Sequence, residues 1–204
     1  MQNKEVPGYV KIVTAGAAES LSLFEDTGAL LRGHFLLSSG LHSDCYFQCA
    51  TLLEDPVTAA KIAKAVAARC ADLKPDVVLA PAMGAVIFGY ELARQLGIRS
   101  IFAERPNGTF ELRRGFHITK GQRVLMAENV VTTGGSIDET ALMAQQLGGE
   151  IVGYALIVDR SQGEWRPNAP VITYANLKAQ TYDPIRCPLC AAGTRAHKPG
   201  SRSF

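Results

Sequence analysis

The residues best suited to chemistry lie close together in the segment VLMAENVVTTGGSIDET, positions 124–140. An apolar run at 124–127 precedes the polar pair Glu128 and Asn129, and hydroxyl and glycine residues follow. Glycines let backbone amides approach a ligand, hydroxyls add hydrogen-bond donors, and a helix N-terminus favours negative charge. The segment therefore predicts a loop that binds a phosphate monoester, called the phosphate loop below. Its residues are Val130, Val131, Thr132, Thr133, Gly134, Gly135 and Ser136.

Glu128 and Asn129 directly precede this loop, where they can accept hydrogen bonds from the vicinal hydroxyls of a sugar. A sugar phosphate therefore suits both halves of the segment. The alternative is a simple strand-to-helix turn in which Ser136 caps the helix. The segment is neither a Walker motif, because no lysine follows the glycines, nor the dinucleotide motif GxGxxG.

Apolar patterning predicts the elements that would position this segment. Short apolar runs typical of strands buried on both faces alternate with amphipathic stretches about 12 residues long, which favours βαβ units. We expect an α/β fold with a central, mostly parallel sheet flanked by helices, and ligand-binding loops at the carboxyl ends of its strands. The expected strands are 77–80, 100–103, 123–127, 152–158 and 171–174, and the expected helices are 85–96, 135–147 and one that begins at Asp55 or Pro56.

Residues about 28–53 and part of the C-terminal region are expected to form a small hood over a single domain that covers residues 1–204. The segment GHFLLSSGLHSDCYFQCATLL, positions 33–53, predicts a hairpin with a turn at Ser38, Ser39 and Gly40. Before it, apolar residues at roughly helical spacing predict one or two helices within residues 9–31.

A long polar connection, residues 104–121, is expected to be a functional arm rather than an idle loop. Asn107 and Gly108 predict a hairpin turn within it. The arm supplies cations that could neutralise a polyanionic ligand: Arg105, Arg113, Arg114, His117 and Lys120.

Composition excludes several classes of protein. The formal charge is +2 and no five like charges are consecutive, which argues against a mainly electrostatic nucleic-acid or membrane binder. No apolar run approaches about 18 residues, and the N-terminus lacks the apolar stretch of a secretory signal, so a cytoplasmic protein is expected.

The five cysteines cannot all pair within one chain. Cys187 and Cys190 form CPLC, which is either a turn stiffened by Pro188 or half of a zinc site that Cys45 and Cys49, or His197, would complete. We assign no residue as a metal ligand on this pattern. The following KPGSR, positions 198–202, is predicted to be an unstructured end rather than a surface anion site.

With these motifs, the chain resembles the orotate branch of the type I phosphoribosyltransferases. The segment 124–140 resembles the ribose-phosphate signature of that family. APAMG at 80–84 resembles its diphosphate loop, and AERPNG with LRRGF resembles its catalytic loop. GHFLLSSGLHSDCYF resembles the hood that holds orotate, and VDR, which ends at Arg160, resembles the strand end whose arginine pairs with orotate. The resemblance implies the type I phosphoribosyltransferase fold.

The resemblance also implies an activity: transfer of ribose 5-phosphate from 5-phosphoribosyl 1-diphosphate to orotate in UMP biosynthesis, with Mg²⁺ and in a homodimer. The implied catalytic residues are Glu128, Asn129 and Arg114. The implied diphosphate and ribose contacts add Arg105, Ala82, Met83, Gly84 and the phosphate loop, and the implied orotate contacts are Thr132, Arg160, Ser39 and Gly40.

The chain departs from the family pattern at two positions. Asn129 stands where the signature normally has a second acid, and Ser38 where many members have lysine. Two alternatives follow: a phosphoribosyltransferase for another base, which would not need a cation such as Arg160, and a regulatory protein that binds phosphoribosyl diphosphate without turnover because an acid is lost.

Overall fold

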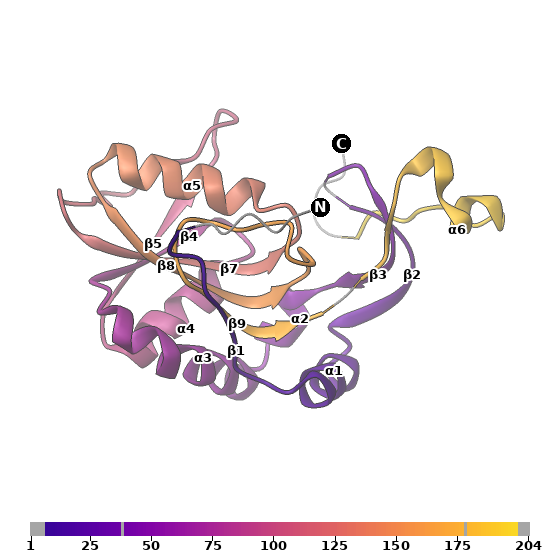
Figure 1. Cartoon of the computed structure of the whole chain (residues 1–204), viewed down its shortest axis with the longest axis horizontal. Helices are drawn as coiled ribbons and strands as arrows, with labels where there is room; N and C mark the ends of the chain where they lie inside the picture. Colours follow the sequence, from indigo (N-terminus) through magenta and orange to yellow (C-terminus); the bar gives the residue numbers. More distant parts are fainter. Residues whose placement is uncertain (1–6, 38, 178, 200–204) are drawn as a thin grey trace.

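A seven-stranded sheet forms the centre of the computed structural model, which describes residues 7–37, 39–177 and 179–199 (Figure 1). The strand order is β1-β9-β8-β7-β4-β5-β6, and every neighbouring pair is parallel except β5 with β6. The strands are β1 (Lys11–Val13), β4 (Val77–Pro81), β5 (Arg99–Glu104), β6 (Glu111–Leu112), β7 (Arg123–Val131), β8 (Glu150–Asp159) and β9 (Val171–Asn176).

Helices cover both faces of this sheet. Helices α3 (Pro56–Cys70) and α4 (Val86–Leu96) pack on one face, and α5 (Gly135–Gln146) on the other (Figure 1). Strand β4 is apolar on both faces, so each face needs a cover. Val78 and Ala80 belong to the apolar cluster with α3 and α4, whereas Val77 and Leu79 belong to the cluster with α5. The predicted α/β fold is therefore confirmed.

The ends of the main helices have local causes. The Asp55 carboxylate accepts hydrogen bonds from the N–H groups of Val57 and Thr58, and Pro56 occupies the first turn, so α3 begins where the sequence predicts. Helix α4 ends at Gly97, whose φ of 70° lies in the left-handed region that glycine adopts without steric cost.

A second sheet forms the hood, at one side of the central sheet (Figure 1). Its antiparallel strands are β2 (Leu30–Leu36), β3 (His42–Phe47) and β10 (Thr181–Tyr182), with α6 (Pro188–Ala191) beyond them. The predicted hairpin is confirmed, with Gly40 at a φ of 82° in the connection, while Ser38 lies outside the described residues. The short elements α1 (Ala17–Asp26), α2 (Cys49–Leu53), η1 (Ala71–Leu73) and η2 (Pro184–Arg186) complete the fold.

Two expectations need correction. Residues 9–31 do not form only helices, because Lys11–Val13 forms the edge strand β1, paired with β9, before the single helix α1. Strand β7 does not end at position 127 but continues to Val131, so Glu128 and Asn129 are strand residues. The hairpin predicted at Asn107 and Gly108 is confirmed, because β5 and β6 pair around it. No helix among the described residues is long and apolar enough to cross a membrane.

Candidate active site

A cavity of about 960 Å³ lies where the carboxyl ends of β4, β7 and β8 face the hood. Three segments predicted from the sequence line it together: the loop that follows β4, the end of β7 with the phosphate loop, and the residue after β8. The predicted residues in the lining are Ser39, Ala82, Met83, Gly84, Arg105, Glu128, Asn129, Val130, Val131, Thr132, Thr133, Gly134, Gly135, Ser136 and Arg160.

The phosphate loop is held in shape by Gly134 and Trp165. Gly134 has a φ of 83° and directly precedes α5, and a methyl group at its Cα would lie 2.1 Å from Cδ1 and Nε1 of Trp165. The indole Nε1 donates to the Asp138 carboxylate in the first turn of α5, at 3.0 Å. The amides at the start of α5 and the loop hydroxyls therefore line the cavity, as anion binding at a helix N-terminus requires.

Glu128 and Asn129 differ in exposure and in partners. The buried Glu128 carboxylate accepts a hydrogen bond from the Asn129 N–H at 2.9 Å, and burial raises its pKa to about 7. The Asn129 side-chain oxygen accepts from the Val130 N–H at 2.7 Å. Its Nδ2 lies so close to Gly84 that a methyl group there would be 2.8 Å away. Gly84 thus lets the loop after β4 approach the end of β7.

Arg160 is a buried cation at the cavity wall. Its backbone N–H donates to the carbonyl of Val131 at 2.8 Å, which places it beside the first residues of the phosphate loop. The guanidinium donates to Ser43 Oγ of the hood at 3.1 Å and lies 5.1 Å from the centroid of the Phe47 ring. Burial lowers the pKa of Arg160, and Nε has no hydrogen-bond partner among the described residues.

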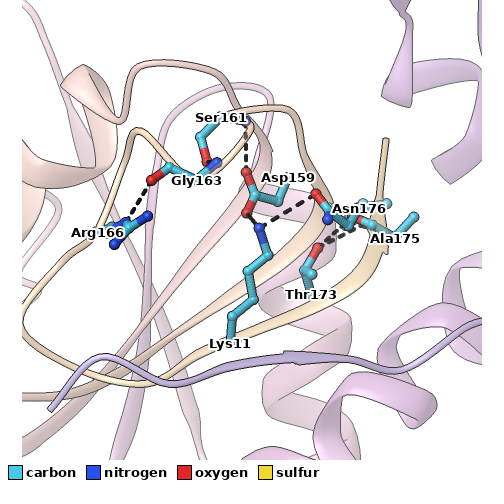
Figure 2. Close-up of polar contacts among 9 residues, drawn as sticks. Lys11, Asp159, Ser161, Gly163, Arg166, Thr173, Ala175 and Asn176 are labelled. Atoms are coloured by element: carbon cyan, nitrogen blue, oxygen red, sulfur yellow. Dashed lines mark hydrogen bonds and ion pairs between the residues drawn. The ribbon is translucent and has the colours of Figure 1, made fainter. Parts of the chain in front are cut away.

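The neighbouring carboxylate of Asp159 does not neutralise Arg160. Figure 2 shows that Asp159 points to Lys11 of β1, at 2.6 Å, and that it accepts from the Ser161 N–H. Lys11 also reaches Asn176 at the end of β9. Within the described part of the chain, Arg160 has no ion pair with a carboxylate, although the more distant Asp44 carboxylate opposes the lowering of its pKa. The site therefore presents a buried positive charge that suits an anionic ligand.

The arm cations occupy different places. Arg105 lines the cavity, pairs with Glu139 and stacks 4.1 Å over the Phe110 ring. Arg114 instead pairs with Glu104 through two hydrogen bonds of 2.9 Å and is not among the described residues that line the cavity. The structure thus does not bring Arg114 to the other predicted catalytic residues within one chain.

Gly40 does not line the cavity either, in contrast to Ser39. Several residues that do contribute were missed in the sequence, among them Ser43, Trp165 and Lys198. Ser43 and Trp165 support the site through the contacts above. The only signal in the sequence for Trp165 is that it is the single tryptophan of the chain. Lys198 lines the cavity with Pro199, so the prediction of an unstructured end is wrong for these two residues. Residues 200–202 lie outside the described part.

Comparison with known proteins agrees with this geometry. The family model described as "Phosphoribosyl transferase domain" matches residues 50–184. A curated orotate phosphoribosyltransferase of Caldicellulosiruptor saccharolyticus is 51% identical over 182 residues, which cover 89% of this chain and 95% of that protein. The chain belongs to the orotate phosphoribosyltransferase family. A second member, from Novosphingobium aromaticivorans, is 49% identical over 91% of this chain and 97% of its own length.

Solved structures show the same fold. The crystal structure of orotate phosphoribosyltransferase from Aeropyrum pernix aligns with a TM-score of 0.63 at 24% identity, over 76% of this chain and 92% of that one. The crystal structure of adenine phosphoribosyltransferase from Rhodothermus marinus also aligns with a TM-score of 0.63, at 19% identity, over 78% of this chain and 99% of that one. The type I phosphoribosyltransferase fold predicted from the sequence is confirmed.

Proposed function

We propose that this enzyme transfers ribose 5-phosphate from 5-phosphoribosyl 1-diphosphate to N1 of orotate, and so produces orotidine 5′-phosphate and diphosphate for UMP synthesis. One observation carries the proposal: the buried guanidinium of Arg160, without a carboxylate partner in the described residues, shares a cavity with the phosphate loop. A base with a carboxylate would supply the missing negative charge, and a neutral purine or uracil would not.

The phosphoribosyl substrate fits the other walls of the cavity. Amides and hydroxyls of Thr132, Thr133, Gly135 and Ser136 would bind the 5′-phosphate at the N-terminus of α5. Glu128 and Asn129 would bind the ribose hydroxyls. The diphosphate would then lie toward the loop of Ala82, Met83 and Gly84, with Arg105 nearby.

Charge separation defines what the chain must stabilise. When the C1–O bond to diphosphate breaks, positive charge develops on the ribose and negative charge on the leaving group. Ionised Glu128 would stabilise the ribose side, while amides of residues 82–84 and the Arg105 guanidinium would stabilise diphosphate. Arg160 would hold the orotate carboxylate so that N1 faces C1, with Thr132 and Ser39 as neighbouring polar contacts.

The site suits Mg²⁺ because the Glu128 carboxylate lines the same cavity as residues 82–84, where the diphosphate would bind, and Mg²⁺ prefers oxygen ligands. When bound, this hard cation would offset the negative charge that develops on the diphosphate leaving group. The phosphate loop would orient the phosphoribosyl group, and Arg160 would orient orotate.

We also propose a homodimer in the cytoplasm. Arg114 carries a positive charge on the exposed arm yet does not reach the cavity of its own chain, which supports a role in the site of a second copy. The five cysteines are free, as is typical of a reducing compartment.

A spectrophotometric assay of orotidylate formation tests the activity directly. Purified protein with phosphoribosyl diphosphate and Mg²⁺ should consume orotate but neither uracil nor adenine. Calorimetric titration with phosphoribosyl diphosphate runs in parallel. Binding without turnover of any base would overturn the proposal in favour of a regulatory protein, and turnover of a neutral base alone would reassign the substrate.

A further inference from the structure

Two histidines and two cysteines from distant parts of the chain meet in the hood, outside the cavity. His34 lies on β2 and His42 on β3, while Cys187 and Cys190 flank the start of α6, which lies beside these strands in Figure 1. One ligand atom from each residue lies within 4.8 Å of the other three. We call this group the hood cluster. None of its members lines the cavity described above.

We propose that the hood cluster binds one structural zinc ion. Two imidazoles and two thiolates form one of the common closed zinc ligand sets, and CPLC has the C-x2-C spacing found in such sites. In the sequence, CPLC had no convincing second half. The structure supplies it from the β2–β3 hairpin and not from Cys45, Cys49 or His197.

The distances between ligand atoms fit a tetrahedron around one ion. His34 Nε2 is 2.9 Å from His42 Nδ1 and 3.5 Å from Cys187 Sγ. Cys190 Sγ is 3.8 Å from His34 Nε2 and 3.4 Å from His42 Nδ1. Zinc bonds of about 2.0–2.1 Å to nitrogen and about 2.3 Å to sulfur place neighbouring tetrahedral ligands roughly 3.3–3.8 Å apart. These four separations lie within about 0.5 Å of that range, and the two that join Cys187 Sγ to His42 and Cys190 are at most 4.8 Å, so side-chain movements of about 1 Å or less would close the cluster around the ion.

A hydroxyl group already orients one ligand, the imidazole of His34. The Thr194 hydroxyl donates to the carbonyl of Leu189 at 2.7 Å, so toward His34 Nδ1, 2.9 Å away, it acts as an acceptor. Nδ1 of His34 therefore carries the proton and Nε2 is left with the lone pair that faces the cysteines. This is the arrangement in which a histidine binds zinc through Nε2.

The site would fasten the C-terminal segment to the hood. Beyond Cys190 the chain turns back along β2, where the His197 N–H donates to the His34 carbonyl and the His197 carbonyl accepts from the Leu36 N–H, both at 2.8 Å. The next residue, Lys198, lines the substrate cavity. Zinc would therefore hold a cationic side chain at the cavity, a consequence that rests on the proposed function.

Metal content of the full chain, produced without an affinity tag, tests the site independently of activity. We expect one zinc ion per chain in the wild type and in the controls Cys45→Ser and His197→Ala, which change a thiol of the same hairpin and a histidine of the same tail. Cys190→Ser and His42→Ala should lose the metal. A wild type that takes up no zinc, or a Cys190→Ser variant that binds it equally tightly, would overturn the proposal.

Three measurements on the wild type keep the test valid if a variant fails to fold. A mercurial reagent that modifies thiols should release the zinc, detected with a chromogenic chelator. Cobalt-substituted protein should show the absorption of tetrahedral Co²⁺ with thiolate ligands. Removal of zinc should lower the Tm by at least about 5 °C, reversibly. If the cluster is only a hydrogen-bonded histidine pair beside two thiols, the mercurial would release no zinc, cobalt would give no thiolate absorption and chelation would leave the Tm unchanged. That result would overturn the proposal.

The link to Lys198 has its own test. In a protein that turns over orotate, enzyme stripped of zinc and assayed with Mg²⁺ restored should show a raised KM for the same substrate that Lys198→Ala affects, by about the same factor. Stripping zinc from Lys198→Ala should have no further effect. Unchanged KM values after chelation would refute the link while the zinc measurements stand. Zinc binding in a protein without turnover would refute the proposed function alone.

Discussion

Gly134 Cα lies directly against the indole of Trp165, in a space too small for a methyl group. Trp165 is buried, packs edge to face on Tyr154 at 5.3 Å between ring centroids, and donates to Asp138 of α5. A residue 31 positions away in the chain thus determines the shape of the phosphate loop. The sequence of the phosphate loop does not indicate this contact with Trp165, because by itself it is typical of an ordinary glycine-rich turn.

Substitution of Gly134 should therefore damage substrate binding. Gly134→Ala places Cβ 2.1 Å from two indole atoms and requires a left-handed backbone, which costs about 1–2 kcal/mol before any steric overlap. We expect the Kd for phosphoribosyl diphosphate, measured by calorimetry, to rise roughly tenfold or more. Gly135→Ala is the matched comparison: it keeps the backbone N–H that we assign to the phosphate, and the nearest atom to its added methyl group is 3.9 Å away, so its Kd should rise less. Equal losses in the two variants would show that Trp165 does not shape the loop.

Replacement of Asn129 by aspartate tests the departure from the family signature. Aspartate keeps an oxygen that can accept from the Val130 N–H and adds a negative charge beside the developing positive charge of the ribose. We expect Asn129→Asp to raise the single-turnover rate severalfold and Asn129→Ala to lower it. An unchanged or lower rate in Asn129→Asp would mean that Glu128 alone supplies the required charge.

Loss of the Arg160 guanidinium should affect the two substrates unequally. Arg160→Ala removes the buried cation that we assign to the orotate carboxylate, so the KM for orotate should rise roughly 100-fold, as expected for a lost charge-assisted pair. The KM for phosphoribosyl diphosphate serves as the internal control and should change far less. Arg160→Lys should give an intermediate value because it keeps charge without the planar fork. Equal effects on both substrates would argue for a general structural role.

The pKa of Glu128 predicts how stability depends on pH. In the folded chain burial raises this pKa to about 7, above the value of about 4.3 in an unfolded chain, so the folded state binds the proton more tightly. The contribution of Glu128 to the free energy of unfolding is therefore most favourable below about pH 4 and falls as pH rises to about 7, by roughly 3 kcal/mol.

Glu128→Gln removes this dependence. Urea unfolding across the pH range should show that the variant is more stable than the wild type above pH 7 and that the two curves converge in acid. Parallel curves at all pH values would indicate that Glu128 titrates normally in the fold.

Several features were predictable because they depend on neighbours in the sequence. The Asp55-Pro56 helix start, the Asn107-Gly108 hairpin and the strands of the parallel sheet follow from local capping, turn and apolar patterns. The position of the predicted phosphate loop before α5 was predictable for the same reason, since its glycines, hydroxyls and following helix are contiguous. The edge strand β1 was not, because three residues paired with β9 carry too little periodicity to distinguish a strand from a helix.

The sequence by itself determined the α/β fold and the family to which the chain belongs, and it predicted the phosphate loop. Only the tertiary structure decided that Asp159 pairs with Lys11 and not with Arg160, and that Trp165 packs against Gly134 of the loop. It also brought His34 and His42 next to Cys187 and Cys190. The physical reason is that these contacts join residues brought together by chain crossovers and by burial. No local pattern encodes such a distance, and burial is also what gives each of these polar groups its chemistry.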